Sequence, residues 1–285
     1  MGIMIKYLFL RLLEKLNILD KINFSICINL NEKKIKIPIL KGIGLYNIKV
    51  TEKWLIKLFS EISTLKGGSF IDVGANLGQT LIKIKSVNLG IRYIGLEPNP
   101  ICVSYLIELI KKNKFKNCEI LPVGLSNKNS LVKLNCYHGD TDSSASILEG
   151  FRKAKINQSF WVSTFNFESI YELLDIEKIS IVKIDVEGAE LEVIKGMEEI
   201  FVQHRPFIFC EILPVYDKKK IFRLNRQKEI EHIIKKLKYR IFRILKEDKL
   251  VLLEQIGIHS NLDLCNYLFI PSDFLSEIPK DLNIL

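Results

Sequence analysis

The chain has 285 residues, of which 48% are hydrophobic and 26% are charged. This composition excludes a disordered or fibrous protein, and it suffices for one large α/β domain with a small extension or for two modest domains. The formal net charge is +9. A basic surface attracts nucleic acid, anionic lipid or acidic glycans, but a lysine-rich solvated surface gives the same charge without a partner, and we favour that interpretation.

The cysteines and the N-terminal segment bear on the cellular location. The six cysteines are scattered without a C-x-x-C pair, which argues against a zinc site or redox pair and favours a reducing cytoplasm. The most apolar N-terminal run, from Ile3 to Leu13, contains Lys6 and Arg11. It is too short to span a membrane and lacks a signal-peptide cleavage site. We therefore predict a cytoplasmic protein, either free or in peripheral contact with a membrane.

Residues 1–50 are predicted to form an N-terminal helix and β-hairpin extension, followed by the main domain over 51–285. The helical pattern over residues 3–19 mixes large apolar residues with basic ones. Such a helix packs on the domain, packs on a second copy in a homo-oligomer, or rests on a membrane surface. Residues 24–30 and 34–40 alternate between apolar and polar, which predicts the hairpin.

A strand, a glycine turn and a helix are predicted over residues 69–87. Ser69 to Val73 are typical of a buried strand, and a turn with Gly74 and Gly78 leads to a helix over 81–87. This arrangement forms a cradle for a small ligand in an open α/β sheet. Asp72 is expected to direct its carboxylate into the crevice above the sheet. The alternative is an ordinary strand-to-helix turn with a capping Asp.

The next predicted strand ends at Glu97, 19 residues after Gly78 (97 − 78). This is close to the offset of about 20 residues at which an acid binds ribose in nucleotide sites. A carboxylate can accept hydrogen bonds from two ribose hydroxyls at once. Asn76 replaces the middle glycine of a dinucleotide fingerprint. The turn therefore favours a ligand with a nucleoside and an amino acid, such as S-adenosylmethionine.

The pattern changes after the third strand, which is predicted at 118–123 after a helix over 101–114. Ser126, in the following loop, is expected either to lie beside an adenine or simply to form a turn. Residues 129–166 depart from the strand–helix alternation, and we predict an insertion that covers the acceptor pocket. Its polar loop, residues 138–146, is expected to be mobile unless a ligand orders it.

The fourth and fifth strands also end in acids. The run Ile179 to Ile184 precedes Asp185 and Glu187, and a strand after Arg205 ends at Glu211. Carboxyl ends of parallel strands meet at one edge, where α/β sheets bind ligands. The alternative for Asp185 is a helix N-cap.

The helix after the fourth strand and the C-terminal segments complete the predicted sheet. Glu190 and Glu192 are expected only to complement a helix dipole, and Gly196 to cap that helix. Residues 217–249 are basic and predicted as a helix and a strand, with a final strand at 266–271.

These motifs resemble the FkbM family of S-adenosylmethionine-dependent methyltransferases. The resemblance rests on the runs at 70–78 and 95–100 and above all on Lys183 to Glu190, and it covers residues 69–271. It implies a class I methyltransferase (Rossmann-like) fold, a three-layer α/β sandwich with a mostly parallel seven-stranded sheet and an antiparallel last strand. It also implies methylation, mostly on oxygen, of saccharides of cell-surface polymers or of natural products.

The resemblance assigns roles to the residues at the carboxyl ends of the strands. Asp185 and Glu187 are expected between the cofactor sulfonium and the acceptor, and one of them should act as the general base, with Glu211 and His204 as weaker candidates. The acids are compatible with Mg²⁺, but no ligand spacing requires it and no metal is predicted. The expected cofactor-binding residues are Asp72, Gly74, Ala75, Asn76, Gly78, Thr80, Glu97, Pro98, Asn99 and Ser126.

Two other functions compete with a small-molecule or saccharide acceptor. A nucleic-acid methyltransferase would use the basic C-terminal region, but amino methyltransferases of that kind usually carry Asn/Asp-Pro-Pro-Tyr/Phe where this chain has Asp185 to Gly188. A non-catalytic scaffold would keep the glycine turn and lose the acids on the acceptor side, which are present here. Both are less favoured than O-methyl transfer.

Overall fold

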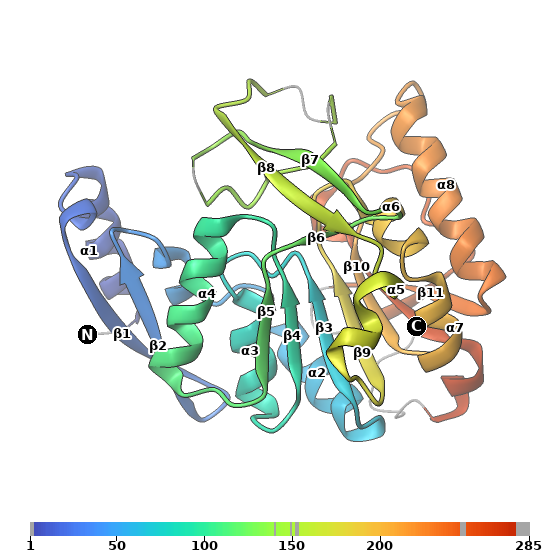
Figure 1. Ribbon diagram of the computed structural model, residues 1–285, viewed down its shortest axis with the longest axis horizontal. Helices are drawn as coiled ribbons and strands as arrows, with labels where there is room; N and C mark the ends of the chain where they lie inside the picture. The colour runs from blue at the N-terminus through green and yellow to red at the C-terminus, as the bar shows by residue number, and fades with distance from the viewer. Residues whose placement is uncertain (1–2, 140, 149, 152–153, 246–248, 278–285) are drawn as a thin grey trace.

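The computed structural model describes residues 3–139, 141–148, 150–151, 154–245 and 249–277. Its centre is an eight-stranded sheet with helices on both faces (Figure 1). In spatial order its strands are β12 (Leu250–Leu253), β11 (Tyr239–Ile244), β13 (Asn266–Pro271), β10 (Phe207–Glu211), β9 (Ile179–Ile184), β3 (Ser69–Val73), β4 (Tyr93–Leu96) and β5 (Cys118–Leu121). The predicted α/β fold is therefore confirmed.

The strand directions confirm the prediction in all but one respect. Strands β10, β9, β3, β4 and β5 are parallel, and the last strand, β13, lies antiparallel between β10 and β11. The sheet has eight strands rather than seven, because β12 adds to its edge by pairing antiparallel with β11. This strand has only four residues, which is too short for an alternating pattern to identify it.

Alternating side chains of the sheet pack against two layers of helices. Phe70 belongs to the core beneath α2 (Trp54–Leu65), α3 (Gln79–Val87) and α4 (Pro100–Asn113). Ile71 and Val73 belong to the opposite core. That core is covered by α5 (Glu168–Tyr171), α6 (Glu190–Lys195), α7 (Glu198–His204) and α8 (Ile221–Lys236). Burial on both faces explains why the strands are continuous apolar runs.

The N-terminal segment forms the predicted helix and hairpin. Helix α1 (Ile3–Lys15) is followed by the antiparallel strands β1 (Asn23–Leu30) and β2 (Lys33–Leu40). The helix ends at Lys15, four residues before the predicted end. The hairpin packs beside α4, and its buried side chains, such as Ile37, belong to the same core as α3 and α4. Within the described part of the chain, no helix has the length and apolar character to cross a membrane.

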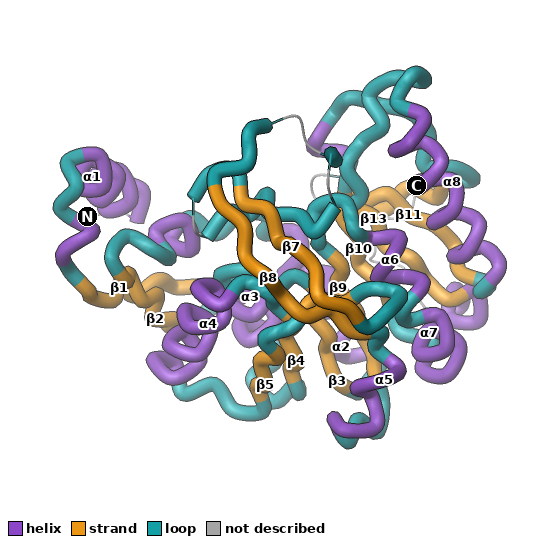
Figure 2. The backbone as a smooth tube through the Cα atoms, turned by 45° about the horizontal axis from the view of Figure 1, so that its top comes forward, coloured by secondary structure: helices purple, strands orange, loops and turns teal. Residues whose placement is uncertain are grey.

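A small three-stranded sheet lies across the carboxyl edge of the large one, the edge where its parallel strands end (Figures 1 and 2). It consists of β6 (Gly124–Leu125), β8 (Gln158–Phe165) and β7 (Ser130–Cys136), with β7 and β8 antiparallel. Strands β7 and β8 together with their connection correspond to the predicted insertion over residues 129–166. The small sheet and its connection leave a pocket between themselves and the carboxyl edge.

Candidate active site

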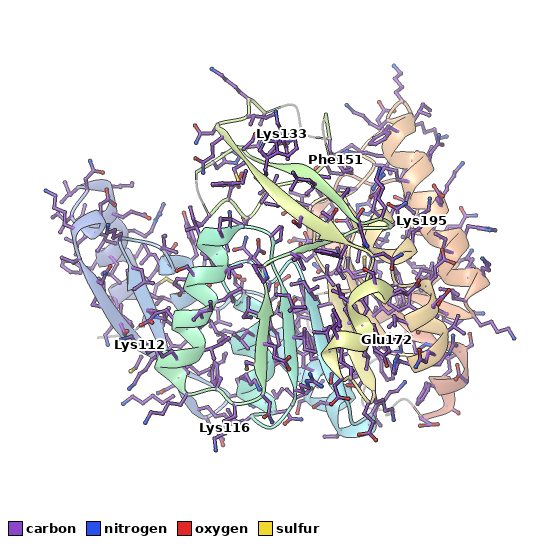
Figure 3. The ribbon with its side chains drawn as sticks, in the orientation of Figure 1. Lys112, Lys116, Lys133, Phe151, Glu172 and Lys195 are labelled. Carbon is purple, nitrogen blue, oxygen red and sulfur yellow. The ribbon has the colours of Figure 1, made fainter. Side chains whose placement is uncertain are left out.

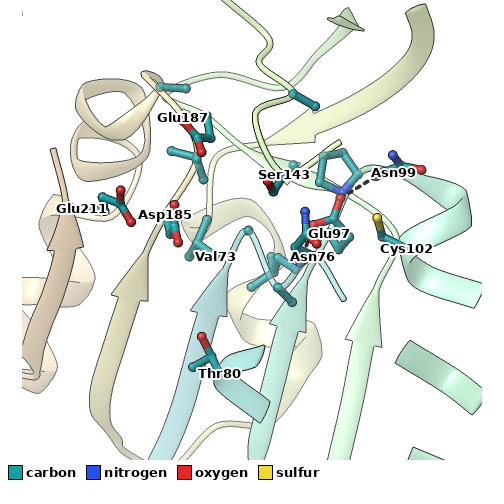
Figure 4. Close-up of a pocket in the computed structure, with 18 of the residues that line it drawn as sticks. Val73, Asn76, Thr80, Glu97, Asn99, Cys102, Ser143, Asp185, Glu187 and Glu211 are labelled. Carbon is teal, nitrogen blue, oxygen red and sulfur yellow. Dashed lines mark hydrogen bonds between the residues drawn. The ribbon is translucent and has the colours of Figure 1, made fainter. Parts of the chain in front are cut away.

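The pocket at the carboxyl edge collects side chains from both halves of the large sheet. Figure 4 shows Asn76, Glu97 and Asn99 on one side of Val73, and Asp185 and Glu211 on the other. The predicted residues that line it are Gly74, Ala75, Asn76, Thr80, Glu97, Pro98, Asn99, Asp185, Glu187 and Glu211. Asp72, Gly78 and Ser126 are absent from the lining.

The turn after β3 brings two loops into close contact. Gly74 has φ +86°, and a Cβ there would lie 2.0 Å from the carbonyl oxygen of Asp185. Only glycine tolerates both this conformation and this approach. The N–H groups of Gly74 and Ala75 both donate to the carbonyl oxygen of Leu96, at 2.9 and 3.2 Å. The cradle is therefore held by the backbone of two adjacent strands.

Glu97 lies at the end of β4 with its carboxylate fixed by backbone groups. Its Oε2 accepts the N–H of Asn76 at 2.7 Å, and its Oε1 accepts that of Asn99 at 2.8 Å. Burial raises the pKa of Glu97 to about 7, although these two hydrogen bonds favour the charged form. Each oxygen retains a lone pair for a second donor. The carboxylate is thus positioned to accept hydrogen bonds from vicinal hydroxyls.

Asp72 does not point into the crevice as expected. Its side chain is completely buried and accepts the hydroxyl hydrogen of Tyr93 at 2.5 Å. Burial raises its pKa to about 6. Gly95 pairs with Asp72 in the sheet and leaves room for the Tyr93 ring. The strand ends one residue later, at Val73, so alternation directs the carboxylate of Asp72 to the face of the sheet where Phe70 packs and not into the pocket.

Gly78 and Ser126 also lie outside the pocket lining, and each contacts a neighbouring structural element instead. Gly78 has φ +80°, and a Cβ there would lie 2.7 Å from Cδ2 of Leu109 on α4. Ser126 donates its N–H to the carbonyl oxygen of Phe165, and its neighbour Leu125 lines the pocket instead. Gly78 therefore lets α3 pack against α4, and Ser126 anchors the small sheet.

The acceptor side of the pocket contains three acids and a lysine. Asp185, Glu187 and Glu211 all line it, and Lys183 Nζ lies 2.8 Å from Oδ2 of Asp185. The nearby negative charge of Asp185, together with burial, holds the pKa of Glu211 well above its usual range. Glu211 therefore favours its protonated form more strongly than an ordinary carboxyl group does. Asp185 does not cap a helix, because α6 begins at Glu190 and its N-cap is Ala189.

Glu187 is presented by a tight turn. Its φ is +54° and that of Gly188 is +112°. A non-glycine residue in the left-handed region stores strain of about 1 kcal/mol or more, and such residues cluster at functional sites. Two hydrogen bonds to the backbone of Gly188 stabilise the turn. Arg226 donates to the carbonyl oxygen of Gly188 at 2.8 Å, and Glu190 accepts the N–H of Gly188 at 2.8 Å.

Sequence reasoning missed three charged residues of the site. Lys183 carried a signal, because a lysine within a buried strand requires a partner. Glu52 lines the pocket and pairs with Lys83 at 2.7 Å, but nothing in its local sequence indicates this. Asp142 accepts the N–H groups of Tyr137 and Ser144 at 2.6 and 2.9 Å. It thereby links Tyr137 to Ser144 on the acceptor side of the pocket, while the predicted mobility of this loop stays a prediction.

Several minor predictions need correction. His204 lies at the opposite end of β9, where it contacts the Tyr171 hydroxyl at 2.7 Å and accepts the N–H of Ile179, so it is no candidate base. Glu192 forms an ion pair with Arg226 rather than serving the helix dipole alone. The prediction for Gly196 is confirmed, because Gly196 is the C-cap of α6. Glycine is needed there because a Cβ would lie 2.1 Å from the Ser126 carbonyl oxygen.

The described residues contain no group of three His, Cys, Asp or Glu side chains arranged to hold a metal ion. The acids of the acceptor side are instead accompanied by Lys183. Lys183 therefore offsets part of the negative charge of this region.

Comparisons with known proteins give the family. The profile of the FkbM methyltransferase domain matches residues 72–244. Hexuronic acid methyltransferase AglP of Haloferax volcanii is 29% identical over 167 residues, which cover 58% of this chain and 64% of AglP. The match thus spans less than two thirds of that relative.

The solved structures that this chain resembles include the following two proteins. Methyltransferase FkbM from Methylobacillus flagellatus is 14% identical with a TM-score of 0.45, over 80% of this chain and 54% of that one. Fibrillarin from Aeropyrum pernix, solved with S-adenosylmethionine, is 11% identical with a TM-score of 0.43, over 86% and 81% of the two chains. Because the family profile covers more than half of the chain, the protein belongs to the FkbM family of S-adenosylmethionine-dependent methyltransferases.

Proposed function

We propose that this protein transfers a methyl group from S-adenosylmethionine to a hydroxyl oxygen of a saccharide acceptor. The observation that carries the proposal is the division of one pocket into two chemically different sides. Glu97 and the glycine cradle lie on one side, and Asp185, Glu187 and Glu211 lie on the other. The name of the relative AglP, a hexuronic acid methyltransferase, supports the choice of a saccharide.

The cofactor side fits S-adenosylmethionine both in its shape and in its polar groups. Gly74 leaves the space that a side chain would fill, and Glu97 offers carboxylate oxygens to the ribose hydroxyls. Asn76 and Thr80 line the same part of the pocket with polar groups for the amino-acid portion. When bound, S-adenosylmethionine supplies an electrophilic methyl group on a sulfonium.

The acceptor side fits proton removal from an alcohol. An alcohol is a poor nucleophile, so a base within hydrogen-bond reach should take its proton as the new bond to carbon forms. Because its raised pKa favours the protonated form, Glu211 can donate a hydrogen bond to the acceptor. We assign the base to Asp185 or Glu187, and Lys183 balances the negative charge that remains.

Two measurements test the proposal in sequence. Calorimetric titration with S-adenosylmethionine should show one site per chain, with a much weaker site in the variant Glu97→Gln. Transfer of a labelled methyl group should then be measured over nucleotide sugars and oligosaccharides. Absence of cofactor binding rejects the whole proposal, whereas binding without transfer to any saccharide rejects the acceptor class.

A further inference from the structure

A second cavity lies beside the acceptor side of the pocket and has the opposite charge. It is formed by the β7–β8 connection and by the segment that leads into α8. Its lining includes three aromatic and three basic residues: Phe151, Tyr216, Phe222, Lys219, Lys220 and Arg223. Figure 3 shows Phe151 at the end of the molecule where the small sheet lies, whereas Lys116 and Glu172 lie at the other end.

This basic–aromatic cavity is joined to the active site through Phe151. A Cβ on Gly188 would lie 2.6 Å from Cε1 of Phe151, so the ring packs directly on the turn that presents Glu187. The guanidinium carbon of Arg223 lies 4.1 Å from the centre of the Phe151 ring, and Arg223 donates to the Phe151 carbonyl oxygen at 2.9 Å. Arg223 thus fixes the side of the cavity nearest to Glu187.

The other residues of the cavity are exposed and suited to a polar ligand. Tyr216 and Phe222 are 45% and 58% exposed. Lys219 and Lys220 are exposed too, and among the described residues no carboxylate forms an ion pair with either ammonium group. The neighbouring acid, Asp217, accepts the backbone N–H of Lys219 at 3.0 Å. Exposed aromatic rings beside unneutralised cations match a ligand with an apolar face and an anionic group.

We propose that the basic–aromatic cavity binds an anionic group, carboxylate or phosphate, carried by the saccharide acceptor. The inference rests on the proposed function and names the acceptor class more closely. A negative group on the sugar is repelled by Asp185 and Glu187 and attracted by Lys219 and Lys220. The two charged regions therefore orient the acceptor, with its anionic group in the cavity, a ring face on Tyr216 or Phe222, and a hydroxyl at Glu187.

Direct binding of small sugars tests this inference without requiring methyl transfer. Glucuronate, glucose 6-phosphate and glucose are titrated into the full chain and followed by NMR line shifts at low and at moderate salt. The test variant is the double substitution Lys219→Gln and Lys220→Gln, which changes exposed side chains only. The matched control is Lys111→Gln and Lys112→Gln, which removes the same charge from exposed positions at the end of α4.

We expect at least one anionic sugar to bind about tenfold or more tightly than glucose, with the preference weakened by salt. The Lys219/Lys220 variant should lose that preference and the Lys111/Lys112 variant should keep it. Preference for glucuronate identifies a uronic acid, and preference for glucose 6-phosphate identifies a phosphorylated sugar. The variant Phe222→Ala should weaken the binding of all three sugars to the same extent.

Equal binding of charged and neutral sugars, or a preference that survives loss of Lys219 and Lys220, overturns the inference. These outcomes are distinct from failure of the proposed function, which is read from titration with S-adenosylmethionine and from methyl transfer. If the protein binds the cofactor and methylates neutral sugars with no charge preference, the proposed function stands and the proposed role of the cavity is wrong.

Discussion

The ammonium group of Lys183 lies 2.8 Å from Oδ2 of Asp185, and its side chain is only 8% exposed. Lys183 also lies opposite Asp72 in the register between the neighbouring strands β3 and β9. Its positive charge opposes the rise in the pKa of Asp72 and of Glu211 that burial and Asp185 cause. One lysine within a buried strand therefore controls the charge of the acceptor side.

Replacing Lys183 tests this relationship. In Lys183→Met the acceptor side loses the positive charge beside its acids, so the pH–rate profile of methyl transfer should move to higher pH by roughly one unit or more. The variant should also lose about 1–3 kcal/mol of stability, because the half-buried Asp185 loses its hydrogen-bonded ion-pair partner.

The double variant Lys183→Met, Asp185→Asn separates stability from activity. It removes both partners of the Lys183–Asp185 ion pair, so its stability should partly recover while its activity does not. Urea denaturation and the pH–rate profile give the two readouts. An unshifted profile in a folded Lys183→Met protein would contradict the role assigned to Lys183.

Glu97 should make the free protein less stable at alkaline pH. Its pKa is about 7 in the folded protein, above the ordinary value of about 4.3. Between these values the folded state holds a proton that the unfolded state has lost, so stability falls as pH rises through this window. Asp72, with a pKa of about 6, and Glu190, with about 7, act in the same direction.

The variant Glu97→Gln isolates this contribution. The free energy of unfolding of the wild type should fall between pH 5 and pH 8 by roughly 2–3 kcal/mol more than that of Glu97→Gln, at about 1.4 kcal/mol per pKa unit. Urea unfolding at pH 5, 6.5 and 8 gives the comparison. Identical pH dependence in the two proteins would show that Glu97 is charged throughout.

Gly74 should tolerate no side chain. In Gly74→Ala the methyl group would lie 2.0 Å from the Asp185 carbonyl oxygen at a φ of +86°, so β3 and β9 must separate. We expect a loss of about 1–3 kcal/mol in stability and loss of S-adenosylmethionine binding. The control is Gly67→Ala, where a Cβ meets nothing within 4 Å. Wild-type cofactor affinity in Gly74→Ala would be inconsistent with the cradle.

The sequence predicted the strands and the meeting of Glu97, Asp185 and Glu211, because buried parallel strands are continuous apolar runs whose carboxyl ends share one edge. The predicted direction of the Asp72 side chain was wrong, because successive side chains of a strand point to opposite faces. An error of one residue in the predicted end of the strand therefore reverses the expected direction. Asp72 and Val73 look equally terminal in the sequence, and only the register with Gly95 and Lys183 decides between them.

Contacts between distant segments could not be predicted. Glu52 lines the pocket because α2 packs against α3 and brings it to Lys83, 31 residues away. The contact of Phe151 with Gly188 depends on how the β7–β8 connection folds back over the sheet. Local periodicity contains no information on either contact, because each is set by tertiary packing.

Helix α1 presents an apolar face that the described chain does not cover. We propose that it rests on a bilayer, as the pattern over residues 3–19 allows, because Lys6 and Lys15 accompany it with charge complementary to anionic lipid. Each of its exposed apolar side chains is at least 52% accessible: Met4, Ile5, Leu8, Phe9 and Leu12.

Sedimentation with phosphatidylglycerol-containing vesicles tests this contact. The wild type should bind, and the variant Leu8→Glu, Leu12→Glu should not. The control Leu131→Glu, Leu173→Glu alters leucines that are 63% and 82% exposed elsewhere and should still bind. A wild type that stays in the supernatant, or that dimerises through α1 without lipid, would argue against membrane contact.

The most direct test of the central claim is methyl transfer to a saccharide by the wild type and by the variants Asp185→Asn and Glu187→Gln, with the product identified by NMR. We expect an O-methyl ether as product. At least one variant should bind S-adenosylmethionine normally and yet transfer methyl groups slower by about a hundredfold or more. Methylation on nitrogen or carbon, or normal turnover in both folded variants, would contradict the account.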